Sequence, residues 1–412
     1  MKRVVAHSDL DSFYCSVEQA LNPSLRGKAI AVCGSVENRH GIILAKSQPA
    51  KKAGVKTGQA AWEAKAACPG LILIPPQYDQ YIKYSQSVHE IYKRFTDDIE
   101  PYGMDECWLD LTASRALFGD GETIARTIQR MVSDELSLSV SIGVAPDKVI
   151  AKLASDMNKP SGITVITPEN WRELVWPLPI SDLLFIGNAT AAKLIEFGIL
   201  TIGDLAVVPI KLLISWFGKN GGTLWLFANG RDVSRVMPGG YEASVKSVGH
   251  GITCSADLIN SAAVWPVLLD LAQDVGKRLR LHRLNARGVQ VCARGNDLGH
   301  GLFQGRLEFP TQSPHIIADM AMQLIESEYK WKRPVRMLTV RAISLEAHKG
   351  SRQLDVWGKV AGQWRRERLE DAVYNIRARF GDGAMMPCSL LQDLPMPEGG
   401  RELVRMPGLY YQ

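Results

Sequence analysis

The order of strand and helix patterns along the chain restricts its fold more than any other feature of the sequence. Short apolar or alternating runs, which are typical of strands, are separated by segments with helical spacing. The strand-like runs are residues 4–8, 28–32, 41–45, 100–112 and 136–144, and the helical segments are residues 12–21, 78–95 and 124–135. Because strands alternate with helices, an α/β or α+β domain is predicted for this part of the chain.

Two further regions differ in pattern from the first. Residues 166–233 are predicted to be helical, with short helices joined by glycine turns as in a helix-hairpin-helix. Residues 232–244 contain Pro238-Gly239-Gly240 and are predicted to be a linker. Beyond the linker, strand and helix patterns follow the order β-α-β-β-α-β, which predicts a ferredoxin-like domain.

The composition is that of a globular protein. Of the 412 residues, 46% are hydrophobic and 22% are charged, which excludes a disordered tail, a coiled coil and a collagen-like chain. No apolar run approaches the ~18 residues of a membrane span, and an acid at position 9 argues against a signal peptide. The seven cysteines form no CxxC pair, so reduced thiols are predicted rather than zinc ligands or disulfides. The net charge of +5 permits an anionic partner without requiring one.

Acidic residues stand at two points where a predicted strand begins or ends. Asp9 follows the strand at residues 4–8, and Asp105 and Glu106 lie in the hairpin at residues 100–112. Carboxylates brought together in a sheet repel one another and are costly to bury unless a cation neutralises them. Mg²⁺ prefers oxygen ligands, and two such ions can promote in-line phosphoryl transfer.

Each acidic segment also has an ordinary structural explanation. Asp9 and Asp11 could belong to the capping region of the helix that follows them, and Asp105 and Glu106 could be solvated at the tip of a hairpin. The two segments together favour a two-metal site, but their spacing alone does not decide between these interpretations.

Four segments resemble motifs of the Y-family translesion DNA polymerases. Residues 9–18 (DLDSFYCSVE) are similar to the first motif of the family, and residues 103–110 (GMDECWLD) to its Ser-x-Asp-Glu-x-x-Leu-Asp motif. The most specific match covers residues 141–162, and residues 246–251 (KSVGHG) are similar to the opening of the little-finger domain. The resemblance extends over about residues 1–380 in the order and spacing of the family. The fingers region and the tail are most similar to the UmuC-like, UV-damage-repair branch, and less similar to the DinB branch.

The resemblance implies a multidomain α+β fold shaped like a right hand. The implied activity is template-directed, low-fidelity DNA synthesis from deoxynucleoside triphosphates, used for translesion synthesis in DNA damage tolerance and the SOS response. The implied parts are a palm (1–11 and 78–165), small fingers (12–77), a thumb with a helix-hairpin-helix (166–231), a linker (232–244), a ferredoxin-like βαββαβ little finger (245–346) and a tail (347–412).

The resemblance also assigns a catalytic centre. Asp9, Asp105 and Glu106, together with the carbonyl oxygen of Leu10, would ligate two Mg²⁺ ions, and Mn²⁺ could substitute for them. Gly103 stands where the family usually has serine before the acidic pair, which removes one side-chain hydrogen bond but leaves both acids. The three acids are therefore the predicted catalytic residues.

Four other residues match positions that bind the incoming nucleotide. Tyr14, next to Phe13, matches the aromatic steric gate, whose ring leaves no room for a 2′-hydroxyl. Lys159 and Lys51 match the basic residues that hold the triphosphate. Lys51 stands where the family often has arginine, and lysine offers a point charge without a bidentate fork.

The DNA contacts implied by the resemblance lie in the thumb and the little finger. Ile186 and Gly187 would form the helix-hairpin-helix turn, whose backbone N–H groups bind a DNA phosphate. Lys246, Arg294 and Arg341 lie on predicted strands or at their ends and would follow the duplex backbone without reading its sequence.

The tail contains a segment that resembles the bacterial sliding-clamp peptide Gln-Leu-x-Leu-Phe. Its residues are Gln353, Leu354, Val356 and Trp357, whose apolar side chains would fill pockets of the clamp. The implied partners are primer-template DNA and a sliding clamp, with accessory SOS subunits or a recombinase as further candidates. A monomer beside the nucleoid in the bacterial cytoplasm is expected, with no membrane contact.

Two other classes of function remain open at this point. A catalytically silent DNA- and clamp-binding accessory protein would need no metal site, and the intact Asp9, Asp105 and Glu106 argue against it. A nucleotide cyclase shares a two-metal palm but has no use for a helix-hairpin-helix or a basic fourth domain. Fold analogy alone would not separate these classes.

Overall fold

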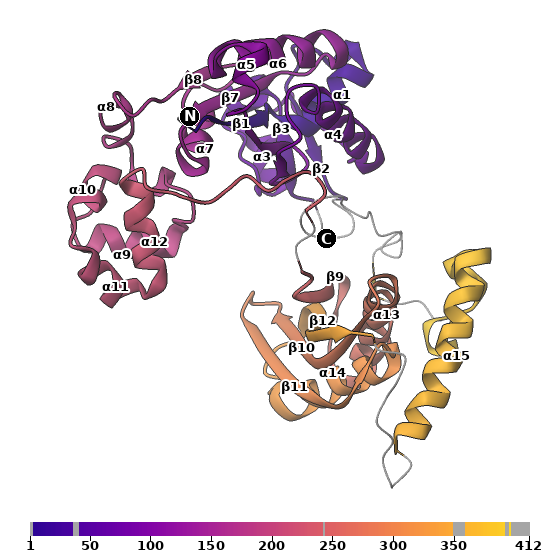
Figure 1. Ribbon diagram of the computed structural model, residues 1–412. Helices are drawn as coiled ribbons and strands as arrows, with labels where there is room; N and C mark the ends of the chain where they lie inside the picture. Colours follow the sequence, from indigo (N-terminus) through magenta and orange to yellow (C-terminus); the bar gives the residue numbers. More distant parts are fainter. Residues whose placement is uncertain (1–2, 36–40, 242–243, 349–358, 392–394, 397–412) are drawn as a thin grey trace. The chain divides into compact units, whose positions relative to one another are not determined.

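The computed structural model describes residues 3–35, 41–241, 244–348, 359–391 and 395–396. The chain divides into two compact units, which meet in sequence at residues 243–244 (Figure 1). Each unit has a hydrophobic core of its own. Within the described residues, no helix has both the length and the apolar character that a membrane crossing requires.

A five-stranded sheet forms the centre of the first unit. Its strand order is β5-β6-β1-β7-β8, with β1 antiparallel to both of its neighbours and β7 parallel to β8. Every residue of β1 and β7 is buried, so both faces of the sheet are covered at its centre. The strands are β1 (Val5–Leu10), β5 (Ile99–Pro101), β6 (Glu106–Asp110), β7 (Val140–Ala145) and β8 (Ile163–Val165).

Helices cover the two faces of this sheet. Alternate residues of a strand point to opposite faces, so Ala6 and Leu10 pack in the core formed with α4 and α6, whereas Val5 packs in the core formed with α7. His7 and Asp9 follow the alternation of Val5 and therefore face α7. The helices are α4 (Tyr78–Tyr92), α5 (Arg115–Phe118), α6 (Gly121–Leu136) and α7 (Lys148–Met157).

Helix α7 lies so close to β7 at Gly143 that no side chain fits at this position. A Cβ atom at Gly143 would stand 2.1 Å from the carbonyl oxygen of Ala151 and 2.4 Å from the amide nitrogen of Ser155. Both atoms belong to the backbone of α7 and cannot move without moving the helix. The glycine therefore sets the distance between the sheet and this helix.

We expect Gly143→Ala to lower the free energy of unfolding by at least ~2 kcal/mol, because the added methyl group overpacks the contact between β7 and α7. The measurement is urea unfolding of the full chain, followed by tryptophan fluorescence. Gly70→Ala is the matched control, since a Cβ atom there would meet nothing within 4 Å. Equal unfolding free energies for the two variants would contradict the close packing.

A smaller, three-stranded sheet belongs to the same unit. Its order is β3-β2-β4, with β2 antiparallel to β3 and parallel to β4. Ile43 and Ala64 are among the residues of its separate small core. The elements are α1 (Phe13–Leu21), η1 (Pro23–Leu25), β2 (Ile30–Cys33), β3 (Ile43–Lys46), α2 (Gln48–Lys52), α3 (Ala61–Ala67) and β4 (Ile72–Ile74).

The predicted helical region after β8 is confirmed. Its helices are short because caps and glycines interrupt them. Thr201 and Asp204 form a capping box at the start of α10, with each side chain accepting a hydrogen bond from the backbone amide of the other. The elements are α8 (Trp171–Val175), η2 (Ile180–Asp182), α9 (Asn188–Glu196), α10 (Ile202–Val207), α11 (Ile210–Phe217) and α12 (Lys219–Ala228).

The second unit is a four-stranded sheet with two long helices packed against it. The predicted element order β-α-β-β-α-β is confirmed by β9 (Ser247–Leu258), α13 (Ser261–Leu281), β10 (Leu284–Gly295), β11 (His300–Thr311), α14 (Pro314–Glu328) and β12 (Val335–Ala347). The strand order is β11-β10-β12-β9, and every pair is antiparallel. A ferredoxin-like sheet would place its first and third strands side by side, whereas here β9 and β11 lie at opposite edges. The sheet differs from the predicted pairing because element order alone does not determine which strands pair.

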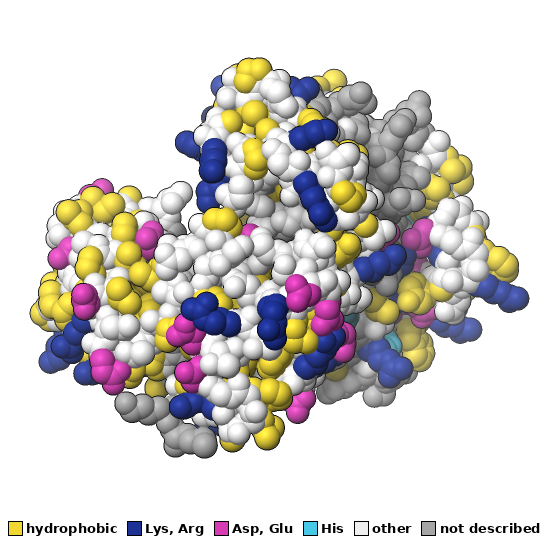
Figure 2. All heavy atoms as spheres, turned by 90° about the horizontal axis from the view of Figure 1, so that it is seen from above, with side chains coloured by type: hydrophobic (Ala, Val, Ile, Leu, Met, Phe, Trp, Pro, Cys, Tyr) yellow, Lys and Arg dark blue, Asp and Glu magenta, His cyan; other side chains and the backbone are white. Residues whose placement is uncertain are grey.

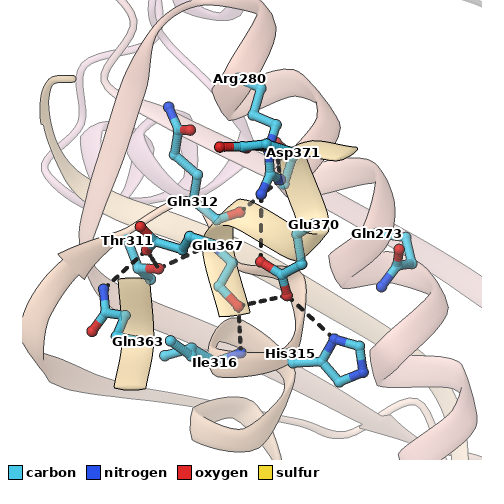
Figure 3. A network of polar contacts seen from close by, with 12 residues as sticks. Gln273, Arg280, Thr311, Gln312, His315, Ile316, Gln363, Glu367, Glu370 and Asp371 are labelled. Atoms are coloured by element: carbon cyan, nitrogen blue, oxygen red, sulfur yellow. Dashed lines mark hydrogen bonds and ion pairs between the residues drawn. The ribbon is translucent and has the colours of Figure 1, made fainter. Parts of the chain in front are cut away.

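A polar network attaches the helix α15 (Lys359–Phe380) to the second unit (Figure 3). Arg280 of α13 contacts Glu370 and Asp371, with nitrogen–oxygen distances of 3.4 and 2.8 Å. Glu370 also accepts a hydrogen bond of 2.8 Å from the hydroxyl of Ser313, at the start of α14. A single carboxylate of α15 therefore connects this helix to two others.

The same side of α15 carries Glu367, which is buried and accepts a hydrogen bond from the hydroxyl of Thr311. The apolar side chains of Leu369, Ile376 and Phe380 are exposed instead. Helices α13 and α14, by contrast, bury apolar faces in the core of the unit. Polar contacts therefore contribute more to the attachment of α15 than they do for the other two helices.

Charged side chains of both signs are scattered over the face of the molecule drawn in Figure 2. On the face of the molecule drawn in Figure 2, basic and acidic side chains are interspersed with apolar ones. This mixture agrees with the small net charge of +5. Binding of an anionic polymer to this face would therefore depend on local groups of lysine and arginine.

Candidate active site

The antiparallel pairing of β1 with β6 brings together the acids of two distant segments. Asp9, near the end of β1, lies directly opposite Glu106, the first residue of β6. The amide of Leu10 donates a hydrogen bond of 2.9 Å to the carbonyl oxygen of Asp105. The structure therefore places Asp9, Asp105 and Glu106 at the adjoining ends of β1, which is the central strand of the sheet, and β6.

Burial and mutual repulsion change the acidity of these carboxyl groups. Burial raises the pKa of Asp9 to about 7. Burial, followed by the charge of Glu106, also raises the pKa of Asp105. For Glu106, burial acts in the same direction, but contacts from His7 and Lys152 outweigh it and lower the pKa to about 2. The three carboxyl groups therefore differ in how readily they are protonated. Added positive charge would stabilise the ionised form of each.

Two lysines contact the acids from the chain that follows β7. Nζ of Lys159 lies 2.5 Å from Asp9 Oδ2 and 2.7 Å from Asp156 Oδ1. Nζ of Lys152, on α7, lies 2.5 Å from Glu106 Oε2. Lys159 is one of the residues that the sequence predicts for this site. Lys152 is not among the predicted residues, and its contact with Glu106 is known only from the structure.

His7 is a second residue of the site that sequence reasoning misses. Its ring is completely buried, with Nδ1 2.8 Å from the hydroxyl of Ser155 and Nε2 3.5 Å from Glu106 Oε2. Burial lowers the pKa of His7 to about 4, so the ring is neutral near pH 7. The available signal was its position two residues before Asp9, which puts both side chains on one face of a strand. No such local signal marks Lys152, because spacing within a helix does not show which strand the helix packs on.

The donor atoms at this site suit a hard divalent cation. Asp9, Asp105 and Glu106 offer carboxylate oxygens, the ligands that Mg²⁺ prefers. Lys159 and Lys152 supply positive charge to two of them through the contacts given above. Among the residues that the structure describes, no three or more His, Cys, Asp or Glu side chains are arranged to hold one metal ion. Cation binding would therefore require the three carboxylates to turn toward a common point.

Gly103 lies beside the carboxylate of Asp105. A Cβ atom at position 103 would stand 3.3 Å from Asp105 Oδ1. A serine hydroxyl at this position could reach that oxygen, whereas glycine offers no side-chain donor. With glycine at position 103, no side chain at this position restrains the carboxylate of Asp105.

Tyr14 is half-buried near the start of α1, in a group of aromatic rings. Its ring stacks on Tyr81 with centroids 4.3 Å apart and 12° between the planes. Tyr78 meets the ring of Tyr14 edge-on at 6.0 Å, and Phe13 is buried beside Tyr81. After burial and Tyr78, the charge of Asp105 is a further cause that raises the pKa of Tyr14. The charge of Asp105 therefore acts on the hydroxyl of Tyr14.

The predicted helix-hairpin-helix turn begins with an exposed aromatic residue. Phe185 is 65% exposed and has a φ of 68°, a left-handed conformation that favours glycine. Ile186 is buried, and Gly187 is the N-cap of α9. A Cβ atom at Gly187 would meet nothing within 4 Å, so the turn is open on that side.

The other predicted basic residues are exposed. Lys51 lies in the last turn of α2, and Lys246 directly precedes β9. Arg341 of β12 pairs with Gln290 of β10, four residues before Arg294 on the same strand. The Arg341 side chain donates a hydrogen bond to Gln290 and that of Arg294 to the carbonyl oxygen of Leu298, so the two arginines mark separate points on the sheet of the second unit.

The predicted clamp peptide lies outside the described residues. It comprises Gln353, Leu354, Val356 and Trp357, all within the undescribed segment 349–358. Nothing in the geometry bears on this prediction.

Comparison with known proteins agrees with the order of these parts. Residues 8–156 match the model of the impB/mucB/samB family, residues 168–199 the IMS family HHH motif, and residues 245–356 the C-terminal domain of the impB/mucB/samB family. A solved Y-family DNA polymerase chimera, Dbh-Dpo4(243-245)-Dbh, superposes with a TM-score of 0.74 at 25% identity. This superposition covers 84% of the present chain and 99% of the chimera.

Curated relatives are closer in sequence. DNA polymerase IV of Acetivibrio thermocellus is 42% identical over 393 residues, which are 95% of this chain and 98% of that protein. The chain belongs to the Y family of DNA polymerases. Its fold is accordingly the α+β fold of that family, with a helix-hairpin-helix motif and a C-terminal little-finger domain.

The relatives also bear on the branch of the Y family. DNA polymerase IV of Moorella thermoacetica is 37% identical, over 91% of this chain and 92% of that protein. DNA polymerase IV of Bacillus velezensis is 39% identical, over 86% of this chain and 85% of that protein. The predicted UmuC-like branch is therefore not supported, and the DinB branch is. The prediction rested on the fingers region and the tail, most of which lies outside the quoted Y-family motifs, so similarity over the whole chain is the better guide.

Proposed function

We propose that this chain is a template-directed DNA polymerase of the DNA polymerase IV (DinB) type. It would extend a primer 3′-hydroxyl with deoxynucleoside triphosphates and copy damaged templates with low fidelity, in DNA damage tolerance and the SOS response. The observation that carries the proposal is the meeting of Asp9, Asp105 and Glu106 at adjoining strand ends, with Lys159 and Lys152 in contact. The end-to-end match to proteins named DNA polymerase IV supports it.

The proposed metal site consists of Asp9, Asp105, Glu106 and the carbonyl oxygen of Leu10. These groups would hold two Mg²⁺ ions, or Mn²⁺ in their place. Such ions, when bound, offset the negative charge of the attacking 3′-oxygen and of the triphosphate. The chain itself holds the carboxylates on a rigid support, since β1 is hydrogen-bonded to β6 on one side and to β7 on the other. Lys159, once released from Asp9, would bind the anionic triphosphate.

The proposed nucleotide site also includes Phe13, Tyr14, Lys51 and Lys159. Tyr14 would be the steric gate, because a half-buried ring that is backed by Tyr81 has little room to retreat from a bulkier sugar. The two lysines would neutralise the triphosphate as point charges.

The proposed domains are those of the right hand. They are a palm (1–11 and 78–165), fingers (12–77), a thumb (166–231), a linker (232–244), a little finger (245–346) and a tail (347–412). Primer-template DNA would be bound by backbone groups at Ile186 and Gly187, and by the side chains of Lys246, Arg294 and Arg341. All of these contacts are of the kind that recognises phosphates, as suits an enzyme that copies any sequence.

A sliding clamp is the proposed protein partner. We expect Leu354→Ala/Trp357→Ala to abolish stimulation of primer extension by the clamp and to leave extension without the clamp unchanged, because these side chains would fill apolar pockets of the clamp. The measurement is extension on a primed circular template with and without the clamp. Leu117→Ala is the control, since it removes an apolar side chain that is 82% exposed elsewhere in the chain. Stimulation that survives in the double variant would locate the clamp contact elsewhere.

Primer extension tests the proposed activity itself. The full chain is incubated with a primed template, the four deoxynucleoside triphosphates and Mg²⁺. We expect extension that follows the template, and continued synthesis past a template lesion. DNA binding without extension, even when the clamp is present, would contradict the proposal and favour a silent accessory protein.

A further inference from the structure

Glu18 is a buried acid for which the proposed mechanism has no use. It is only 3% exposed and lies one helical turn after Tyr14 in α1. Its carboxylate accepts a hydrogen bond of 2.5 Å from the hydroxyl of Tyr81 and one of 2.8 Å from the side-chain amide of Gln77. Both donors are neutral groups. Because burying a carboxyl group costs free energy that an apolar side chain would not, packing alone does not explain an acid at this position.

The ring of Tyr81 connects Glu18 to Tyr14. Tyr81 is completely buried in the first turn of α4, so its backbone is fixed by the helix. Its hydroxyl is held by Glu18, and its face is stacked on Tyr14. Tyr78 closes the group, meeting Tyr14 edge-on at 6.0 Å and Tyr81 at 5.9 Å. A ring held at both ends cannot tilt without breaking the hydrogen bond to Glu18, and it therefore gives Tyr14 a firm support.

We infer that Glu18 is a positioning residue for sugar selection, which acts through Tyr81 to keep the ring of Tyr14 in place against the sugar of the incoming nucleotide. The inference rests on the proposed function, in which Tyr14 is the steric gate. A pocket that only crowds an extra hydroxyl discriminates weakly, and it loses even that discrimination if its wall can move. The firmness of the support would therefore decide how well ribonucleoside triphosphates are excluded.

The test uses two variants that keep the size of each side chain: one breaks the Tyr81–Glu18 hydrogen bond and the other weakens it, since a neutral amide oxygen accepts a weaker bond than a carboxylate. Tyr81→Phe removes the donor, and Glu18→Gln removes the charge of the acceptor. The readout is the ratio of kcat/KM for dCTP to that for CTP, opposite a template guanine and with Mg²⁺. We expect the ratio to fall about tenfold in each variant, mainly because CTP is used better, while kcat/KM for dCTP changes less than about threefold. Tyr84→Phe is the matched control, since it removes a tyrosine hydroxyl from the same helix without affecting the contacts of Glu18.

A double-variant cycle separates this inference from the proposal on which it rests. In a Tyr14→Ala background, Tyr81→Phe should leave the ratio unchanged, because the ring through which it acts is gone. If Tyr14→Ala itself does not change the ratio, the steric gate and the inference both fail. If Tyr14→Ala lowers the ratio but Tyr81→Phe and Glu18→Gln keep the wild-type value, only the inference fails. A loss of kcat/KM that is equal for dCTP and CTP would likewise overturn it, since it would show a structural role alone.

Discussion

Primer extension by the Asp105→Ala/Glu106→Ala variant is expected to fall at least ~1000-fold below that of the wild-type chain. The variant keeps Asp9 as the single acid of the cluster, with Lys159 and Lys152 still close by. Asp9 would then be the one carboxylate of the cluster left to ligate a cation, and Lys159 is in contact with it, so the site would lose its affinity for divalent cations. The measurement is single-turnover extension of a primed template with Mg²⁺.

Loss of Asp105 should be tolerated, because burial opposes its charge and its removal relieves repulsion within the cluster. Loss of Glu106 removes the partner of Lys152, so the variant should be less stable than the wild-type chain but still folded. Thermal unfolding and DNA binding check this expectation. Glu90→Ala/Glu122→Ala is the matched control, since it removes two acids from exposed ion pairs with Lys93 and Arg126. Extension at the wild-type rate by both double variants would place the catalytic centre elsewhere.

Tyr14→Ala is expected to raise the use of ribonucleoside triphosphates, relative to deoxynucleoside triphosphates, on the order of 100-fold. The ring of Tyr14 covers one face of Tyr81, and its removal opens space where a 2′-hydroxyl would lie. Competition between a ribonucleotide and its deoxy counterpart in single-nucleotide insertion measures the ratio. Tyr14→Phe is the control and should keep the wild-type discrimination, because it keeps the ring. Unchanged discrimination in the alanine variant would remove the steric-gate assignment.

Local patterns explain which parts of the fold could be predicted. The apolar run at residues 4–8 and the alternating hairpin at 100–112 were recognisable as strands, and β1, β5 and β6 lie there. Strand pairing depends instead on contacts between residues far apart in sequence. The positions of β1 between β6 and β7, and of β12 between β9 and β10, therefore had no local signal.

The candidate site likewise combines residues that local motifs predict with contacts that depend on the packing of distant segments. Asp9, Asp105 and Glu106 stand in recognisable motifs, and their meeting follows once the two strands pair. The contact of Lys152 with Glu106 depends on how closely α7 packs on β7, which the absence of a side chain at Gly143 permits. No periodicity within α7 carries that information, so a sequence alone could not have supplied this part of the site.

The attachment of α15 sets the limits of a domain that can fold by itself. Arg280 and Ser313 find partners on this helix, and Leu390, which follows it, is buried in the core of the second unit. A chain shortened after β12 would leave both polar groups without those partners and would uncover part of the core. The cooperative folding unit therefore extends at least to Leu390, well past the last strand of its sheet. Fragments that end with the sheet would be incomplete as independent domains, and protease-resistant fragments should end beyond α15.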